Sequence, residues 1–371
     1  MFQRYLTSFE ALQVGLRERD EEALRASVQL LATAHDRSRS QIVVFVGSLP
    51  LANSEPILRR WLAEDWPAQS AAWWVLGYLE RLAPPAATEL RKRLSPLERF
   101  ADIEHEMVAL QAASWLYCHA LVPTNIAAKL PTQVELKLRH WLNATSVALA
   151  LAALQALLRL DVDVSKSEAA RVIAQASNRG LREADVLGMR CGFIECAEKL
   201  VDEMIADGPW ASVAVDALAE VLPDEARARL ETMRPKRWTS SDSAIHVMTV
   251  LAAHHDVKAL QWLERACAQR DPRRRALAWA GRVKAVCKAG DIGERQAVGK
   301  ALLREDEAIR AWVISGLDPS CPTQREWLNQ ARRYGTLEEQ EAVVDAMRAF
   351  SLRGPLVPDD LNASSADASS R

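Results

Sequence analysis

Residues 271–279 read Asp-Pro-Arg-Arg-Arg-Ala-Leu-Ala-Trp, and residues 306–312 read Asp-Glu-Ala-Ile-Arg-Ala-Trp. In each stretch an aspartate precedes a run that favours helix. Asp is a preferred N-cap because its carboxylate accepts hydrogen bonds from free amides and is stabilised by the helix dipole, and proline is tolerated in the first turn. Each stretch therefore predicts a corner at which a helix begins. Trp279 and Trp312 are 33 residues apart, and a fixed period near this value is typical of stacked helical hairpins.

Helical periodicity continues outward from these stretches through most of the chain. Between residues 107 and 121, for example, Val108, Ala112 and Trp115 lie on one helical stripe. Proline, glycine and aspartate separate segments of about 10 to 20 residues, as expected of helices joined by corners. Only residues 42–49 resemble a strand, and we interpret them as a buried helix because helical patterns flank them. The core-facing helices are expected to begin near residues 38, 67, 105, 144, 181, 209, 239, 271, 306 and 336.

The two opening stretches resemble the start of a repeat in HEAT-type proteins and in related short bilin-lyase-type repeats. In such repeats an aspartate at the corner is followed about four residues later by arginine, as Asp271 is by Arg275 and Asp306 by Arg310. The resemblance extends over residues 36–350 and is most specific within 255–350. It implies an all-α fold, an α-solenoid (superhelix) of about ten degenerate HEAT-like helical hairpins, in which the arginine reaches a neighbouring repeat. HEAT proteins share no common activity, so the resemblance implies a fold and not a function.

The same pattern divides the chain into three parts. Residues 1–35 are expected to form N-terminal capping helices, and residues 36–350 the repeat array. The long corner at 235–243 is the place at which the array would be interrupted. Residues 351–371 contain almost no apolar side chain after Leu361, which predicts a disordered C-terminal tail.

Composition excludes several classes of protein. The 371 residues include 47 Lys and Arg against 49 Asp and Glu, so the chain is not the strongly basic body expected of a dedicated nucleic-acid binder. The six cysteines lack zinc-site spacing and are interpreted as reduced core residues. No signal peptide is evident, and the longest apolar stretch, 147–158, is shorter than the ~20 residues that span a bilayer. We therefore expect a cytoplasmic protein without a membrane partner.

Motifs for catalysis or cofactor binding are absent from the sequence. It contains no phosphate-binding glycine loop, no nucleophile elbow and no zinc-protease motif. His246 and His254 are separated by two helical turns, about 12 Å, which is too far for both to bind one ion. Residues 104–106, Glu-His-Glu, are interpreted as a solvated first helical turn. We expect no catalytic residue, no metal and no cofactor.

Tryptophan is unusually frequent, with 12 residues against 4 Tyr and 6 Phe. Four tryptophans recur in a Trp-Leu context at equivalent places, which predicts a position in the hairpin core: Trp61, Trp141, Trp262 and Trp327. Four others do not follow this register. Because exposed aromatic side chains are strong anchors for protein partners, we expect these four to contact a partner: Trp66, Trp74, Trp210 and Trp238.

A basic stripe is the second candidate surface. Six cations gather on the helix that begins at residue 271, and helical geometry places several of them on shared faces: Arg273, Arg274, Arg275, Arg282, Lys284 and Lys288. Such a stripe would suit phosphates or an acidic protein. The alternative interpretation is a solvated face on which the cations form salt bridges.

These observations favour a non-enzymatic HEAT-repeat adaptor or scaffold that binds a partner protein on its concave surface. The Ala- and Arg-rich, Lys-poor composition indicates a bacterial source, in which such a protein would serve as a toxin-immunity or secretion-loading protein. The alternative is nucleic-acid binding through the stripe at 265–300. The extreme form of that alternative is a DNA-glycosylase-like enzyme. The placement of Asp65 between Trp61 and Trp66 faintly resembles the placement of aspartate and tryptophan in such enzymes.

Overall fold

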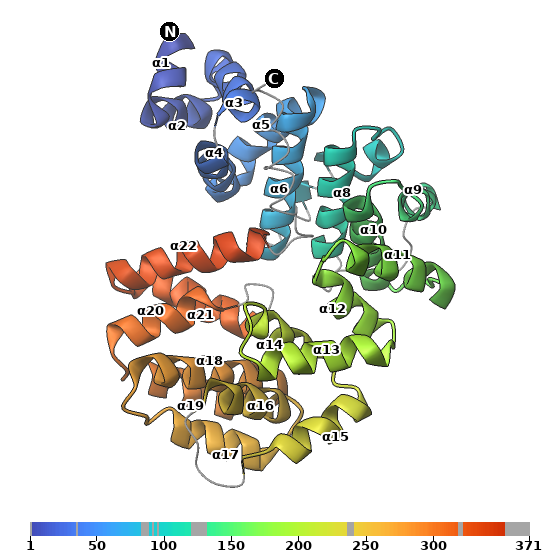
Figure 1. The fold of residues 1–371 in the computed structure, drawn as a ribbon. Coiled ribbons are helices and arrows are strands. Elements are labelled where there is room, and N and C mark those ends of the chain that lie inside the picture. The colour runs from blue at the N-terminus through green and yellow to red at the C-terminus, as the bar shows by residue number, and fades with distance from the viewer. Residues whose placement is uncertain are drawn as a thin grey trace, which may run out of the picture. The chain divides into compact units, whose positions relative to one another are not determined.

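The computed structural model describes residues 2–34, 36–82, 89–90, 93–94, 96–119, 132–235, 241–317 and 322–352. Over these residues every regular element is a helix (Figure 1), which confirms the predicted all-α class. The chain divides into two compact units: unit 1 comprises residues 1–165 together with Ser351 and Leu352, and unit 2 comprises residues 166–350. Trp238 lies outside the described residues. Of the predicted disordered tail at 351–371, Ser351 and Leu352 instead end a helix, and the remainder lies outside the described residues.

Unit 1 is a stack of helical hairpins. Helices α4, α6, α8 and α10 pack on one another in succession, and α5 and α9 pack against them as hairpin partners. Residues 42–48 lie in α4 and Leu49 directly follows it, so the predicted helix there is confirmed. The elements are α1 (Phe2–Thr7), α2 (Phe9–Glu18), α3 (Glu21–Thr33), α4 (Asp36–Ser48), α5 (Leu51–Ala63), α6 (Trp66–Leu82), the 3₁₀ helix η1 (Pro96–Phe100), α8 (Glu106–His119), α9 (Thr132–Leu142) and α10 (Val147–Arg159).

Unit 2 repeats the same arrangement. Helices α14, α16, α18 and α20 pack in succession, and the odd-numbered helices α13, α15, α17, α19 and α21 pack against them. The elements are α11 (Lys166–Asn178), α12 (Glu183–Arg190), α13 (Ile194–Ile205), α14 (Ala211–Glu220), α15 (Asp224–Met233), α16 (Asp242–Ala253), α17 (Val257–Ala266), α18 (Pro272–Ala289), α19 (Ile292–Leu302), α20 (Glu307–Ser315), α21 (Pro322–Tyr334) and α22 (Leu337–Leu352).

The helix starts expected from the sequence are confirmed. Each of the ten lies within three residues of the start of an even-numbered helix between α4 and α22. The caps explain this agreement, since the Asp271 carboxylate accepts a hydrogen bond from the Arg273 amide and Pro272 occupies the first turn of α18. Asp306 precedes α20 without a side-chain capping bond. Its carboxylate instead pairs with Arg275 of the preceding hairpin.

The break considered at 235–243 is not where the units divide. Residues 236–240 lie outside the described part of the chain, but α14 and α15 before them pack on α16 after them. The division falls between Ser165 and Lys166, in a stretch that the sequence pattern presents as one corner among many. The physical reason that 235–243 is no boundary is α16, whose residues 244–253 are all buried. A helix that is apolar all round needs neighbours on every side.

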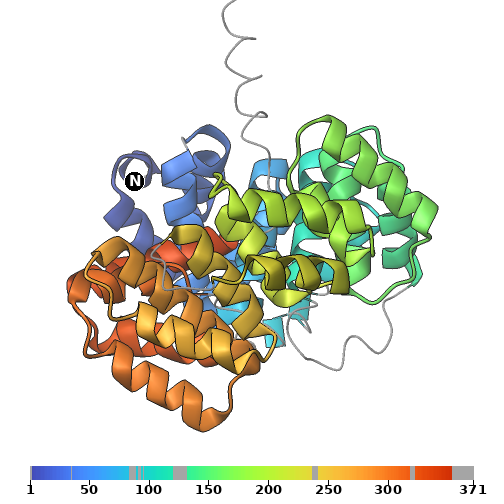
Figure 2. The same cartoon turned by 60° about the horizontal axis from the view of Figure 1, so that its bottom comes forward.

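Those neighbours enclose α16 completely. Helix α18 approaches it closely at Gly281, where a Cβ atom would lie 2.1 Å from the Thr249 Oγ1 atom. Helices α14 and α18 flank α16 (Figure 2) and are joined directly by two lysines of α18. Lys284 forms an ion pair with Asp216 of α14, and Lys288 donates to backbone carbonyls at the end of α14. Residues 244–253 of α16 are therefore covered by neighbouring helices. They do not contribute exposed side chains to the concave docking surface expected from the sequence.

Candidate functional site

The six cations of the predicted stripe do not form one surface. They point from α18 in different directions, and each has a partner. Arg273 and Arg274 both pair with Asp242 at the start of α16, at 3.3 Å and 3.0 Å. Arg282 pairs with Glu264 of α17 at 2.8 Å and lies 5.3 Å from the ring of Trp279. These contacts agree with the salt-bridged interpretation of the stripe.

The two lysines of the stripe serve a structural purpose. The Lys288 ammonium donates to the carbonyl oxygens of Ala219 and Glu220 at the C-terminus of α14, where a helix leaves carbonyls unpaired and favours positive charge. The ring of His254 binds the Leu218 carbonyl of the same helix end at 2.8 Å. Burial lowers the pKa of Lys288. Lys284 and Lys288 therefore fasten α18 to α14.

Two arginines link successive corners of unit 2. Arg275 pairs with Glu305 at 3.4 Å and with Asp306, which lie in the corner before α20. Arg310 occupies the matching place in the next hairpin and pairs with Glu339 of α22 at 2.5 Å. The prediction that this arginine reaches a neighbouring repeat is thus confirmed at both motifs. We call these contacts, with those of Arg273 and Arg274 to Asp242, the charge ladder of unit 2.

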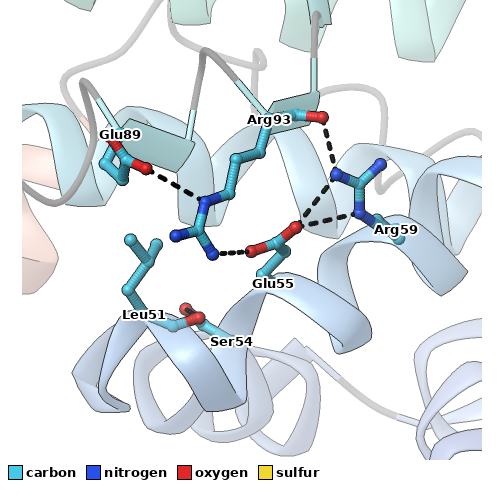
Figure 3. Close-up of polar contacts among 6 residues, drawn as sticks. All are labelled: Leu51, Ser54, Glu55, Arg59, Glu89 and Arg93. Atoms are coloured by element: carbon cyan, nitrogen blue, oxygen red, sulfur yellow. Dashed lines mark hydrogen bonds and ion pairs between the residues drawn. The ribbon is translucent and has the colours of Figure 1, made fainter.

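Unit 1 has a comparable network on α5 (Figure 3). The carboxylate of Glu55 accepts hydrogen bonds from Arg59 at 2.9 Å and from Arg93 at 2.7 Å, and Arg93 also pairs with Glu89 at 3.1 Å. Arg59 donates to the backbone carbonyl of Arg93 at 2.6 Å. The hydrogen bond from Arg93 is the main cause of the lowered pKa of Glu55. Two cations balance two carboxylates, so this network has no net charge to attract an anion and serves to hold Glu89 and Arg93 against α5.

The tryptophans expected in the core fall into two pairs. Trp61 and Trp141, both in unit 1, are buried, and the indole N–H of Trp61 donates to Ser27 at 2.9 Å. Trp262 and Trp327, both in unit 2, are only half-buried. The core prediction is therefore confirmed in unit 1 alone. Of the two tryptophans that flank Asp65 in the sequence, Trp61 is therefore buried and Trp66 is exposed.

The tryptophans expected at a partner surface also differ from one another. Trp66 is 39% exposed, whereas Trp74 and Trp210 are half-buried. The position of Trp238 is outside the described residues. A further exposed tryptophan, Trp312 on α20, is 47% exposed and was not among the candidates.

The sequence does not single out Trp312 as exposed, because the spacing of 33 residues pairs it with Trp279, which occupies a different position in its helix. Trp279 lies eight residues after Asp271, whereas Trp312 lies six residues after Asp306. Two residues correspond to about 200° around a helix, so the two tryptophans face opposite sides, and Trp279 is buried at 4% exposure. The register of Trp279 is occupied in α20 by Ile314, which is buried. Counting from the aspartates gives a step of 35 residues here, in place of the 33 between the tryptophans.

The ring of Trp66 is stacked on the ring of His105. Their centroids are 4.9 Å apart and the planes differ by 8°. Trp66 begins α6 and His105 immediately precedes α8, so the pair joins the corners of two successive hairpins. Both side chains are exposed. The prediction that Glu-His-Glu at 104–106 is solvated is confirmed, since all three side chains are exposed. No local sequence pattern indicates that His105 contacts a ring 39 residues away.

Tertiary hydrogen bonds fix the two corners that carry Trp66 and His105. Arg99 donates to the Leu62 carbonyl at 2.7 Å, and Lys137 donates to the Ala101 carbonyl at 3.1 Å. Phe100 is fully buried between Trp73 and Trp141. The pair is therefore an exposed aromatic surface on a supported backbone, which is the property expected of a partner-binding anchor.

Metal binding and membrane insertion find no support in the described residues. No group of three His, Cys, Asp or Glu among them is arranged to hold a metal ion. His246 is buried 3.9 Å from Asp207, and burial lowers its pKa. None of the helices in the described ranges is long and apolar enough to cross a bilayer. Four cysteines in this part of the chain are free thiols, and burial raises the pKa of Cys267 to about 12.

Comparison with known proteins gives similarity to solved structures alone. No family model matches the chain, and no curated protein matches it. The crystal structure of an engineered protein aligns with 94% of this chain and 93% of its own length, at 17% identity and a TM-score of 0.30. A similarity with that TM-score gives no information about the fold or the function of this chain.

Proposed function

We propose that this chain is a non-enzymatic, HEAT-like helical-repeat scaffold that binds a partner protein through an aromatic surface at Trp66 and His105. The observation that carries the proposal is the stacked, exposed ring pair on a corner fixed by Arg99 and Lys137. The proposal keeps the partner class expected from the sequence and the cytoplasmic, bacterial setting. It moves the docking site from a concave surface to the corners of unit 1.

The contacts of the basic stripe favour this function over nucleic-acid binding. Phosphate recognition needs cations that are free to replace counterions. Here Arg275 and Arg282 are engaged by carboxylates and Lys288 by helix-end carbonyls, within hairpins that they hold together. Charge reversal at these positions is therefore expected to unfold unit 2. A loss of binding in such a variant would not show that the cations contact a ligand.

The test is affinity capture from cells of the source organism with the tagged full-length chain, with and without nuclease. We expect a stoichiometric protein partner that resists nuclease. Trp66→Ala is expected to weaken its capture by about 30-fold, because truncating an aromatic anchor typically costs about 2 kcal/mol of binding free energy.

Trp312→Ala is the matched control, since it removes another exposed tryptophan from unit 2. It should leave capture unchanged. Equal capture by wild type and Trp66→Ala would refute the assigned site. Recovery of partners that are lost on nuclease treatment would favour the nucleic-acid alternative.

A further inference from the structure

Four carboxylates lie close in the chain to Trp66 and His105, and we call them the acidic rim. Asp65 directly precedes Trp66, and three further carboxylates belong to the corner that carries His105: Asp102, Glu104 and Glu106. All four are exposed, and none forms an ion pair with any basic side chain that the structure describes. The two exposed ring-bearing residues are thus accompanied in the chain by four exposed negative charges.

The nearby cations are committed to other groups. Arg60 pairs with Glu64 at 2.8 Å. Arg99 donates to the Leu62 carbonyl, and Lys137 donates to the Ala101 carbonyl while lying 6.0 Å from the ring of Trp141. Arg99 and Lys137 support the corner backbone, Arg60 is paired with Glu64, and none of the three forms an ion pair with a rim carboxylate.

Helix capping alone does not account for this arrangement. A carboxylate near the start of α8 is stabilised by the helix dipole, which explains a preference for acid at Glu106. It does not require two aromatic rings from different hairpins to be stacked in solvent among the acids. An exposed indole within a negative rim is the combination that attracts an organic cation, since the ring face and the carboxylates both favour positive charge.

We propose that the Trp66–His105 surface binds a basic segment of the partner protein, with an arginine or lysine side chain placed against the indole and paired with the rim carboxylates. This inference rests on the proposed function and names the chemistry of the partner. Arginine suits such a site best because its guanidinium both stacks on an aromatic ring and forms paired hydrogen bonds with a carboxylate. Nucleic acids and anionic membranes are repelled by the same rim.

The experiment is selection of a phage-displayed library of random 12-residue peptides on the immobilised full-length chain. Peptides are kept if they bind wild type and Trp312→Ala but fail to bind Trp66→Ala. We expect these Trp66-dependent peptides to be enriched in arginine and lysine relative to the starting library. Their synthetic copies should bind more weakly as the salt concentration rises, because exposed charges are screened.

A charge-neutral rim then tests the carboxylates directly. The fourfold variant Asp65→Asn, Asp102→Asn, Glu104→Gln and Glu106→Gln is expected to bind the synthetic peptides about tenfold more weakly than wild type. The matched control removes four exposed carboxylates from unit 2, with the same change in net charge: Glu307→Gln, Glu338→Gln, Glu341→Gln and Asp345→Asn. It should bind as wild type does.

The outcomes separate the two proposals. Trp66-dependent peptides that are neutral or acidic, or equal affinity for the rim variant and wild type, would overturn the basic partner while the docking site stands. A library that yields no Trp66-dependent peptide would contradict the docking site and the basic partner together. Equal weakening by the rim variant and its unit 2 control would show a general charge effect, and would overturn the role of the rim.

Discussion

Units 1 and 2 are built from the same kind of hairpin but are held together by different interactions. In unit 1, aromatic rings of successive hairpins are in contact: Trp73 lies 5.1 Å from Trp115 and 5.9 Å from Phe100, which lies 5.2 Å from Trp141. These rings come from α6, η1, α8 and α9 and form a continuous apolar interior. Each buried aromatic ring removes a large apolar area from water and so contributes strongly to the stability of unit 1.

Unit 2 has an aliphatic centre and a charged edge. Its central helix α16 is enclosed by its neighbours, and its successive corners are joined by the charge ladder. A hairpin can therefore be fastened to the next one by rings or by ion pairs with little change in the fold. The units also differ in which of the predicted partner-contact residues are available: unit 1 leaves Trp66 exposed beside His105, whereas the six stripe cations of unit 2 are each paired within that unit.

The largest expected effect separates the two interiors. Trp73→Ala removes a buried ring from the centre of the aromatic cluster and should destabilise unit 1 by about 4 kcal/mol, because a cavity forms where the ring was. Hydrogen exchange read peptide by peptide should show loss of protection in α6 and α8. Trp312→Ala, which removes a half-exposed ring from unit 2, should change stability by less than about 1 kcal/mol. Similar losses from both variants would mean that the cluster does not carry unit 1.

A smaller effect is expected from the charge ladder. Arg310→Ala leaves the carboxylate of Glu339, which is only 8% exposed, without its guanidinium partner. We expect unit 2 to lose about 2 kcal/mol, measured by the same exchange experiment in α20 and α22. Arg59→Ala in unit 1 is the matched control, and it should cost less than about 1 kcal/mol because the Arg59 side chain is 50% exposed and Glu55 keeps its hydrogen bond from Arg93. Equal costs for the two variants would contradict the distinction between a ladder and a surface pair.

The smallest effect is a dependence on pH that belongs to unit 2. Burial lowers the pKa of both His246 and His254 below the ordinary value of 6.5. The folded state therefore binds protons less readily than the unfolded state, so the stability is fully present above pH 6.5 and declines as the pH falls below it. Urea unfolding followed by hydrogen-exchange labelling should show unit 2 weakening between pH 6.5 and 5 while unit 1 does not.

The variant His254→Gln provides the control for this dependence. A glutamine amide can still donate to the Leu218 carbonyl that His254 contacts, but it does not titrate. The decline in unit 2 should become shallower in this variant. A decline of the same steepness would exclude His254 as a contributor.

Much of the fold could be predicted because its signals are local. Helix starts depend on caps and first-turn residues within a few positions, as at Asp271 with Pro272 and at Asp291, whose carboxylate and that of Glu294 form a reciprocal capping box. The candidate site was predicted only at Trp66. Its stacking partner, His105, lies on another hairpin, and no periodicity within either helix indicates that the two rings meet.

The sequence by itself determined the all-α class and the positions of the helix starts, because hydrophobic period and capping act over a few residues of chain. The tertiary structure alone decided which charged and aromatic side chains remained available. Lys288 reaches carbonyls 68 residues away, and Arg275 pairs with a carboxylate of the next corner. Side chains that look alike in sequence, such as Trp61 and Trp66, become core and surface because the space around each is filled by distant segments.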